Sequence, residues 1–251
     1  MPSVRFELLT DEGSNVKLEK STGSTWYSVG LSLAPHASSG VMNTCSHASP
    51  ECIRACVAWS GNGNMPSVHV GRTRKTAWFR RDKATFLAAL RRDLHKAVRV
   101  AEGRGLRVSC RLNVFSDLPW ERIAPGLFAE FPDIQFYDYT KNPVRAAAFS
   151  AGLLPPNYHL TFSRSEENER AAVELLLRGV SVAVVFPQFR GSALPETWHG
   201  FTVIDGDKHD LRFTDPRGVV VGLRAKGAMR SDTSGMVDRS PTDASLLDTL
   251  S

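Results

Sequence analysis

The chain has 251 residues, of which 42% are hydrophobic and 23% are charged, and its formal net charge is +5. This length and balance are normal for a soluble globular protein with one sizeable core. The mild positive charge permits a nucleic-acid partner without requiring one. No apolar run approaches the roughly 18 residues of a membrane span, and the first residues lack the pattern of a secretory signal. We therefore expect a cytoplasmic protein with no membrane partner.

Three segments of the chain differ in composition. Residues 1–24 are polar and form an N-terminal extension. Residues 25–228 carry the regular apolar segments of a folded domain, which includes a cysteine-containing loop at 34–66. In residues 229–251 the apolar content falls and Ser, Asp and Thr dominate, so we expect a disordered tail.

The domain opens with a strand expected from Trp26 to Leu33, and the long loop follows it. This loop is rich in Gly, Ser, Asn and Pro, and a loop of that length inside a compact domain is usually functional. Apolar residues at helical spacing then predict a helix from Thr76 to Glu102.

Strands and helices alternate after that helix. We expect strands at 106–114, 134–137, 158–162, 180–186, 201–204 and 219–223, and helices at 119–131, 144–150 and 166–178. This alternation indicates βαβ units and parallel strands. The sequence therefore predicts an α/β fold, a partial or full parallel β/α barrel of the TIM-barrel type within residues 25–228.

Three of the four cysteines lie within a dozen residues of the loop: Cys45, Cys52 and Cys56. In a reducing cytosol, clustered cysteines indicate metal or redox ligands rather than disulfides. Three thiolates can hold a [4Fe–4S] cluster and leave one iron open, which we favour. A structural zinc would need a fourth ligand, for which the candidates are His36, His47, His69 and Cys110. Because Cys110 lies within an expected strand, we predict that it is a packing residue.

Polar residues follow the expected strands, and in a parallel α/β fold they would converge with the cysteine loop on one rim. They are Asn113, Ser116, Asp117, Asp138, Lys141, Ser163, Arg164 and Asp205. Structural roles are the alternative for several of them. Ser116–Asp117 and Ser165 could cap the helices that follow, and residues 205–207 could form a plain turn.

Several longer phrases carry a family resemblance. They are Gly30–Pro35, Arg111–Asn113 with Ser116–Asp117 and Trp120–Glu121, Phe136–Lys141, Asn157–Ser163, and Gly206–Asp207 with Asp210–Arg212. Over residues 17–227 the chain resembles the uncharacterised phage gene product 88 family. The cysteine loop followed by a β/α series is also similar to the radical-SAM superfamily. That superfamily spaces its cysteines by three and then two residues, whereas this chain has six and then three.

The resemblance implies a radical-SAM-like iron–sulfur enzyme of unknown substrate. Cys45, Cys52 and Cys56 would ligate a [4Fe–4S] cluster that chelates S-adenosylmethionine. Asn113, Ser116 and Asp117 would bind that cofactor, and the substrate pocket would be lined by Asp138, Lys141, Ser163, Arg164 and Asp205. The partners would be the substrate and a reductant such as a flavodoxin or ferredoxin, in the host cytoplasm if the protein is phage-encoded.

Two alternatives remain open at the level of the sequence. In a metal-dependent hydrolase or nuclease, the cysteines would hold a structural zinc and a divalent cation would be bound by Asp205, Asp207, His209, Asp210 and Asp215. In a non-catalytic nucleic-acid-binding protein, phosphates would be gripped by Arg72, Arg74, Lys75, Arg80, Arg81 and Lys83. The same basic residues could equally form a solvated helix face.

Overall fold

The computed structural model describes residues 7–13, 18, 25–59 and 61–240. The chain forms two compact units, each of which combines strands with helices. Unit 1 comprises Met1–Ser46, Val57–Asp138 and Leu154–His159, and unit 2 comprises His47–Cys56, Tyr139–Leu153 and Leu160–Ser251. Most of the expected N-terminal extension, and residues 241–251 of the expected tail, lie outside the described residues.

The strands of unit 1 are ordered β1 (Leu9–Asp11), β2 (Trp26–Leu31), β3 (Arg107–Arg111) and β4 (Ile134–Thr140), whose last residues belong to unit 2. β1 pairs with β2 antiparallel, whereas β2–β3 and β3–β4 are parallel. All of β2 is buried, so the hydroxyl of its serine needs an internal partner. The hydroxyls of Ser28 and Ser109 pair across the β2–β3 contact, at 2.8 Å.

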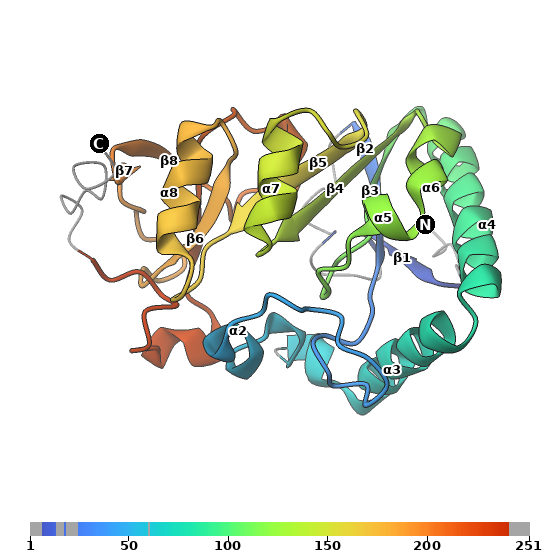
Figure 1. Cartoon of the computed structure of the whole chain (residues 1–251), viewed down its shortest axis with the longest axis horizontal. Helices are drawn as coiled ribbons and strands as arrows, with labels where there is room; N and C mark the ends of the chain where they lie inside the picture. The colour runs from blue at the N-terminus through green and yellow to red at the C-terminus, as the bar shows by residue number, and fades with distance from the viewer. Residues whose placement is uncertain (1–6, 14–17, 19–24, 60, 241–251) are drawn as a thin grey trace. The chain divides into compact units, whose positions relative to one another are not determined.

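The helices of unit 1 differ from the expected ones at their ends. α3 (Pro66–Arg81) and α4 (Lys83–Glu102) replace the single helix expected over 76–102 (Figure 1). Asp82 separates them because its side chain accepts the Thr85 N–H at 3.1 Å and so starts a new helix. Pro125 likewise divides the helix expected over 119–131 into α5 (Trp120–Ile123) and α6 (Pro125–Glu130). The short 3₁₀ turns η1 (Val57–Trp59) and η2 (Gly61–Asn64) precede α3.

Aromatic side chains fill the core of unit 1. The Phe128 ring from α6 lies 4.9 Å from that of Phe136 on β4 and stacks on Tyr158 at 4.6 Å. Phe79 of α3 contacts Phe86 of α4 and Trp120 of α5 at 5.2 and 5.7 Å. All of these side chains are almost inaccessible to solvent, so their burial is a main source of this unit's stability.

The strands of unit 2 are ordered β5 (Tyr158–Ser163, which begins in unit 1), β6 (Val182–Phe186), β9 (Val220–Arg224), β8 (Phe201–Asp205) and β7 (Thr197–Trp198). The pairs β5–β6, β6–β9 and β8–β9 are parallel, whereas β7 and β8 are antiparallel. The helices are α2 (Pro50–Arg54), α7 (Pro143–Ser150) and α8 (Glu169–Leu177), with 3₁₀ turns η3 (Arg212–Thr214) and η4 (Gly227–Ser231). α7 and α8 lie side by side (Figure 1). Val173 and Leu176 of α8 share a buried cluster with Phe162, Val182 and Val220.

The predicted α/β class is therefore confirmed, with strands and helices in alternation and mostly parallel strand pairing. None of the described helices is long and apolar enough to cross a membrane.

The segment expected to be a disordered tail is packed over its first part. Met229, Met236 and Val237 are buried and form a cluster with Ala225. Val237 also bridges to Val185 of β6 in the parallel sense. These few apolar residues hold residues 229–240 against the rest of unit 2, although the overall composition of the tail is polar.

We predict that Asp93 is a strong determinant of stability in unit 1. From α4 its carboxylate accepts the backbone N–H groups of Glu7, Leu8 and Leu9 at 3.1, 2.6 and 3.0 Å. Asp93→Asn should lower the free energy of unfolding by about 2 kcal/mol, because an amide cannot accept all three. Urea unfolding of the variant measures this loss.

Arg92→Ala on the same helix is the matched control. Arg92 is exposed and pairs with Glu7 at 3.0 Å, so its loss should cost less than about 1 kcal/mol. Equal losses in the two variants would contradict the role given to Asp93.

Candidate functional site

A compact loop after β2 fixes Cys45 in unit 1. The Thr44 hydroxyl donates to the Ala34 carbonyl at 2.6 Å, and the Thr44 N–H donates to the His36 carbonyl at 3.0 Å. The Cys45 N–H donates to Asn43 Oδ1 at 2.8 Å. His36 takes up the left-handed region with a φ of 50°. The position of Cys45 is thus set by hydrogen bonds within the loop itself.

The half-buried sulfur of Cys45 lies against the loop that follows β3. The His36 N–H donates to Cys45 Sγ at 3.3 Å, and the thiol donates to the Phe115 carbonyl at 3.5 Å. The Asp117 N–H donates to the Thr44 carbonyl at 2.8 Å. Two of the segments expected at one rim are therefore in contact within unit 1. N–H groups aimed at sulfur are also a feature of iron–sulfur ligands, where they tune the reduction potential.

Asn113 is the centre of a buried network behind this loop. Its Oδ1 accepts the Ser116 hydroxyl at 2.8 Å, the Leu118 N–H at 2.9 Å and the Trp120 indole N–H at 3.2 Å. Its Nδ2 donates to the Leu118 carbonyl and to Asp138 Oδ2, both at 3.0 Å. The side-chain amide is fully used in folding this loop.

Asp138 on β4 completes the network. It is inaccessible to solvent and accepts the Asn113 N–H at 2.7 Å and the Tyr158 hydroxyl at 2.8 Å. Cys110 on β3 is also fully buried, and that burial, with the nearby Asp138 charge, raises the pKa of the Cys110 thiol. The prediction that Cys110 is a packing residue is confirmed.

The network assigns positioning roles to residues that the sequence led us to expect at a ligand. Asn113, Ser116 and Asp138 are buried and hold one another. The alternative role of Ser116–Asp117 as a helix cap is wrong, because the N-cap of α5 is Pro119. Ser165 does not cap α8 either, since the N-cap there is Asn168. Cofactor binding by Asn113, Ser116 and Asp117 stays a prediction.

Cys52 and Cys56 lie in unit 2, within and just beyond α2. Ser49 caps this helix by accepting the Cys52 N–H at 3.3 Å. Glu166, which follows β5, then accepts the Ser49 hydroxyl at 2.8 Å and the Glu51 N–H at 3.0 Å. The Glu166 carboxylate thus fixes the start of α2. Its negative charge also interacts favourably with the positive end of the helix dipole.

The opposite end of α2 is anchored to the last described segment of unit 2. Arg54 pairs with the buried Asp232 at 3.3 Å. Cys52 and Ala55 pack against the cluster of Ala225, Met229, Met236 and Val237. Cys52 and Cys56 are themselves half-buried, and neither forms a disulfide in the part of the chain that the structure describes. The helix that carries them is therefore held at both ends.

The structure brings together three of the predicted substrate-binding residues. Lys141 Nζ donates to Ser163 Oγ at 3.0 Å and to the Ser163 and Arg164 carbonyls at 3.3 and 3.1 Å. Arg164 forms an ion pair with Glu169, whose other oxygen lies 3.2 Å from His199 Nε2. Contact of these residues with a substrate stays a prediction.

Asp205 is engaged by a cation. At the end of β8 its carboxylate accepts Arg224 Nη1 and Nη2 at 2.8 and 3.1 Å. Asp207 also binds Arg224, at 3.3 Å, and Lys226, at 2.6 Å. The hydrogen bonds from Arg224 lower the pKa of Asp205. Residues 205–207 therefore form ion pairs, which the alternative of a plain turn did not include.

The other acidic residues of the hydrolase alternative are also engaged. Asp215 lies 3.1 Å from the buried Arg212 and 3.6 Å from His209, and Asp210 accepts the Tyr139 hydroxyl at 3.3 Å. Burial raises the pKa of Asp215. Ion pairs and hydrogen bonds with protein groups thus engage several of the oxygens that a divalent cation would need.

Within the described ranges, no group of three or more His, Cys, Asp or Glu side chains is arranged to hold a metal ion. Cys45 belongs to unit 1, whereas Cys52 and Cys56 belong to unit 2. The site composed of all three stays a prediction that rests on their spacing in the sequence.

The basic segment 72–83, which was one alternative for nucleic-acid binding, has fewer cationic side chains available to a phosphate than its sequence indicated. Arg72 is buried and donates to the Ala58 and Gly63 carbonyls at 3.0 and 3.2 Å. Lys75 donates to the Leu8 carbonyl at 2.6 Å, and burial lowers its pKa. These two residues do not belong to a phosphate-binding surface.

Sequence reasoning missed the residues that surround a pocket in unit 2, among them Phe186, Trp198, His199 and Asp238. Phe186 ends β6, so its position at a strand end was a usable signal. Asp238 gave none, because it lies in the segment expected to be disordered.

We predict that Asn113→Ala loosens the Cys45 loop as well as destabilising unit 1. The substitution leaves several buried donors without acceptors and should cost about 3 kcal/mol. Hydrogen exchange of residues 34–45 should become faster, because the Asp117–Thr44 contact depends on the loop that Asn113 folds. Mass spectrometry of exchanged peptides measures it.

Gln135→Ala is the control, since the half-buried Gln135 side chain donates to the Phe136 and Asn157 carbonyls, away from the Cys45 loop. Its effect on residues 34–45 should be negligible. If Asn113→Ala left exchange there unchanged, Asn113 would have no part in positioning Cys45.

We predict a pH-dependent contribution from Asp205. Its folded-state pKa lies below the ordinary value of 3.8, so its stabilising effect is complete above that pH. The effect is lost as the pH falls through the folded-state pKa. Asp205→Asn should lower the melting temperature near neutral pH, and its difference from the wild type should shrink as the pH falls below 3.8. Thermal unfolding across this range measures it, with the exposed Asp133→Asn as control; parallel curves at every pH would refute the prediction.

Comparison with known proteins gives one family. The gene product 88 family matches residues 7–240. No curated protein and no solved structure matches the chain. With nearly the whole chain covered by that match, the protein belongs to the gene product 88 family.

Proposed function

We propose that the protein is an iron–sulfur enzyme of radical-SAM-like type, with Cys45, Cys52 and Cys56 as the ligands of a [4Fe–4S] cluster. A partial or full parallel β/α barrel, with the cysteine loop at its carboxyl rim, is part of the proposal. No substrate is assigned.

The observation that carries the proposal is the setting of Cys45. Its loop is held by internal hydrogen bonds, its sulfur accepts the His36 N–H at 3.3 Å, and Asp117 binds the adjacent Thr44. This is a preorganised thiol beside the loop to which the resemblance assigns cofactor binding. Preorganisation lowers the cost of ordering a ligand when a metal binds.

The donor set fits an iron–sulfur cluster in its chemistry. Cys45, Cys52 and Cys56 are half-buried and form no disulfide within the described residues, whereas Cys110 is fully buried. If the three accessible thiols are the ligands and Cys110 is inaccessible, one iron of the cluster has no thiolate ligand. The apolar cluster beside Cys52 would limit solvent access and so influence the reduction potential.

When bound, the cluster would supply one electron for reductive cleavage of S-adenosylmethionine. The chain's own residues would position and shield the reactants. Asn113 and Asp138 hold the loop that carries Asp117, and Lys141 orders the Ser163–Arg164 segment. A reductant protein such as a flavodoxin or ferredoxin would deliver the electron.

We predict that anaerobically purified protein contains iron and acid-labile sulfide in about equal amounts and absorbs visible light. Each of Cys45→Ala, Cys52→Ala and Cys56→Ala should lower bound iron by about tenfold or more, since even outer-sphere changes cost about 10–100-fold in metal affinity. Cys110→Ala is the matched control and should retain its iron.

Metal and sulfide analysis of the four variants decides the matter. Detection of one zinc per chain and no sulfide would indicate a structural zinc site instead of an iron–sulfur cluster. Full iron content in Cys52→Ala would refute the ligand assignment. Formation of 5′-deoxyadenosine from S-adenosylmethionine under reduction then separates an enzyme from a structural cluster protein.

A further inference from the structure

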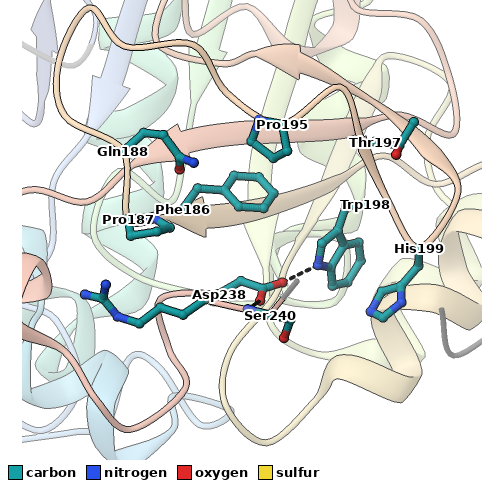
Figure 2. A pocket seen from close by; sticks show the side chains of 10 residues that line it. Phe186, Pro187, Gln188, Pro195, Thr197, Trp198, His199, Asp238 and Ser240 are labelled. Carbon is teal, nitrogen blue, oxygen red and sulfur yellow. Dashed lines mark hydrogen bonds between the residues drawn. The ribbon is translucent and has the colours of Figure 1, made fainter. Parts of the chain in front are cut away.

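A pocket of about 310 Å³ lies in unit 2, and none of its lining residues is assigned to the proposed cluster. Phe186, Pro187 and Gln188 line it from the end of β6, and Pro195 and Thr197–His199 line it from β7 and its approach. Asp238, Arg239 and Ser240 complete the wall. Figure 2 shows Phe186, Trp198 and Asp238 pointing toward a common space.

The carboxylate in this pocket is buried and rigidly held. Asp238 is 4% exposed and accepts the Trp198 indole N–H and the Ser240 N–H, the latter at 2.8 Å. Its own N–H donates to the Val185 carbonyl of β6 at 2.8 Å. The side chain is thus fixed before any ligand arrives.

Asp238 has no cationic partner among the residues that the structure describes. Residues 241–251, which follow it in the chain, contain no Lys, Arg or His. Arg239 directs its Nε and Nη2 to the carbonyls of Asp232 and Arg230, at 3.1 and 3.0 Å. A buried carboxylate that lacks a counter-charge favours a positively charged ligand.

The other polar and aromatic groups of the pocket indicate which kind of cation it would bind. Gln188 Oε1 is buried and has no hydrogen-bond partner in the described part of the chain, so the ligand should carry N–H donors. The almost fully buried rings of Phe186 and Trp198 offer aromatic surfaces. A guanidinium is planar, always charged, rich in N–H donors, and stacks on aromatic rings.

Competing ligands meet these conditions less well. A quaternary ammonium has no N–H for Gln188. A neutral nucleobase would leave the Asp238 charge uncompensated. A primary ammonium satisfies charge and donors, but it is compact and strongly hydrated, so it gains less from the aromatic walls.

We propose that this pocket binds a guanidinium group, with Asp238 as its counter-ion, Gln188 as a second acceptor, and Trp198 and Phe186 as stacking surfaces. This goes beyond the proposed iron–sulfur function and does not depend on it. The guanidinium belongs either to a small molecule or to an arginine side chain of another protein.

The test titrates the full-length protein with methylguanidinium and with methylurea, its neutral planar counterpart. The readout is the Trp198 indole N–H resonance, identified by its loss in Trp198→Phe. We expect methylguanidinium to shift this resonance in a saturable manner and to bind at least about tenfold more tightly than methylurea. Equal binding of the two probes, or no saturable shift, would overturn the proposal.

Variants locate the interaction. Asp238→Asn keeps the shape and removes the charge, so it should weaken methylguanidinium binding by about tenfold or more. Asp133→Asn, an exposed site in unit 1, should bind like the wild type. Should Asp238→Asn fail to fold, Gln188→Met serves instead, with an expected loss of severalfold. Unchanged affinity in a folded Asp238→Asn would refute the assignment.

Two further probes separate the sources of the group. Agmatine represents a free small molecule, and an arginine dipeptide capped at both ends represents a protein side chain. Tighter binding of agmatine assigns a small-molecule ligand, and tighter binding of the peptide assigns a protein partner. Failure of both while the three cysteine variants lose iron would remove the pocket proposal and leave the cluster proposal standing.

Discussion

The buried charge of Asp138 is the constraint on which the arrangement of unit 1 depends. A carboxylate that is inaccessible to solvent must be satisfied by protein donors, and Asn113 and Tyr158 provide them. Asn113 then folds the loop after β3, and the Asp117 amide of that loop binds Thr44, the neighbour of Cys45. The position of the Cys45 thiol is therefore linked, through successive hydrogen bonds, to a charge in the core.

Unit 2 uses carboxylates in the same way, but closer to its surface. Glu166 fixes the start of the helix that carries Cys52, and Glu169 joins Arg164 to His199 at the pocket. Asp205 and Asp207 are neutralised by Arg224 and Lys226. Asp238 differs from Glu169, Asp205 and Asp207 because none of the described cations pairs with it, and it is more deeply buried than Glu166. An unpaired and buried carboxylate is the basis for proposing that its pocket binds a cation.

The sequence predicted the alternation of elements and the parallel pairing, because apolar periodicity is local and strong. It also predicted that the polar residues after the strands would converge, and among them Lys141 does meet Ser163 and Arg164. It could not show that Asn113 and Asp138 form hydrogen bonds with each other, or that Arg224 forms an ion pair with Asp205, because those partners are distant along the chain. The break at Asp82 was missed since the apolar stripe continues across it, and the packed part of the tail was missed since few residues anchor it.

The central claim is that three thiolates hold a four-iron cluster with one open iron. Mössbauer spectroscopy of protein reconstituted anaerobically with ⁵⁷Fe and sulfide tests it most directly. The account predicts the signature of a [4Fe–4S] cluster and a change at one iron site when S-adenosylmethionine is added. Four iron sites that do not respond to S-adenosylmethionine, or no bound cluster at all, would contradict it.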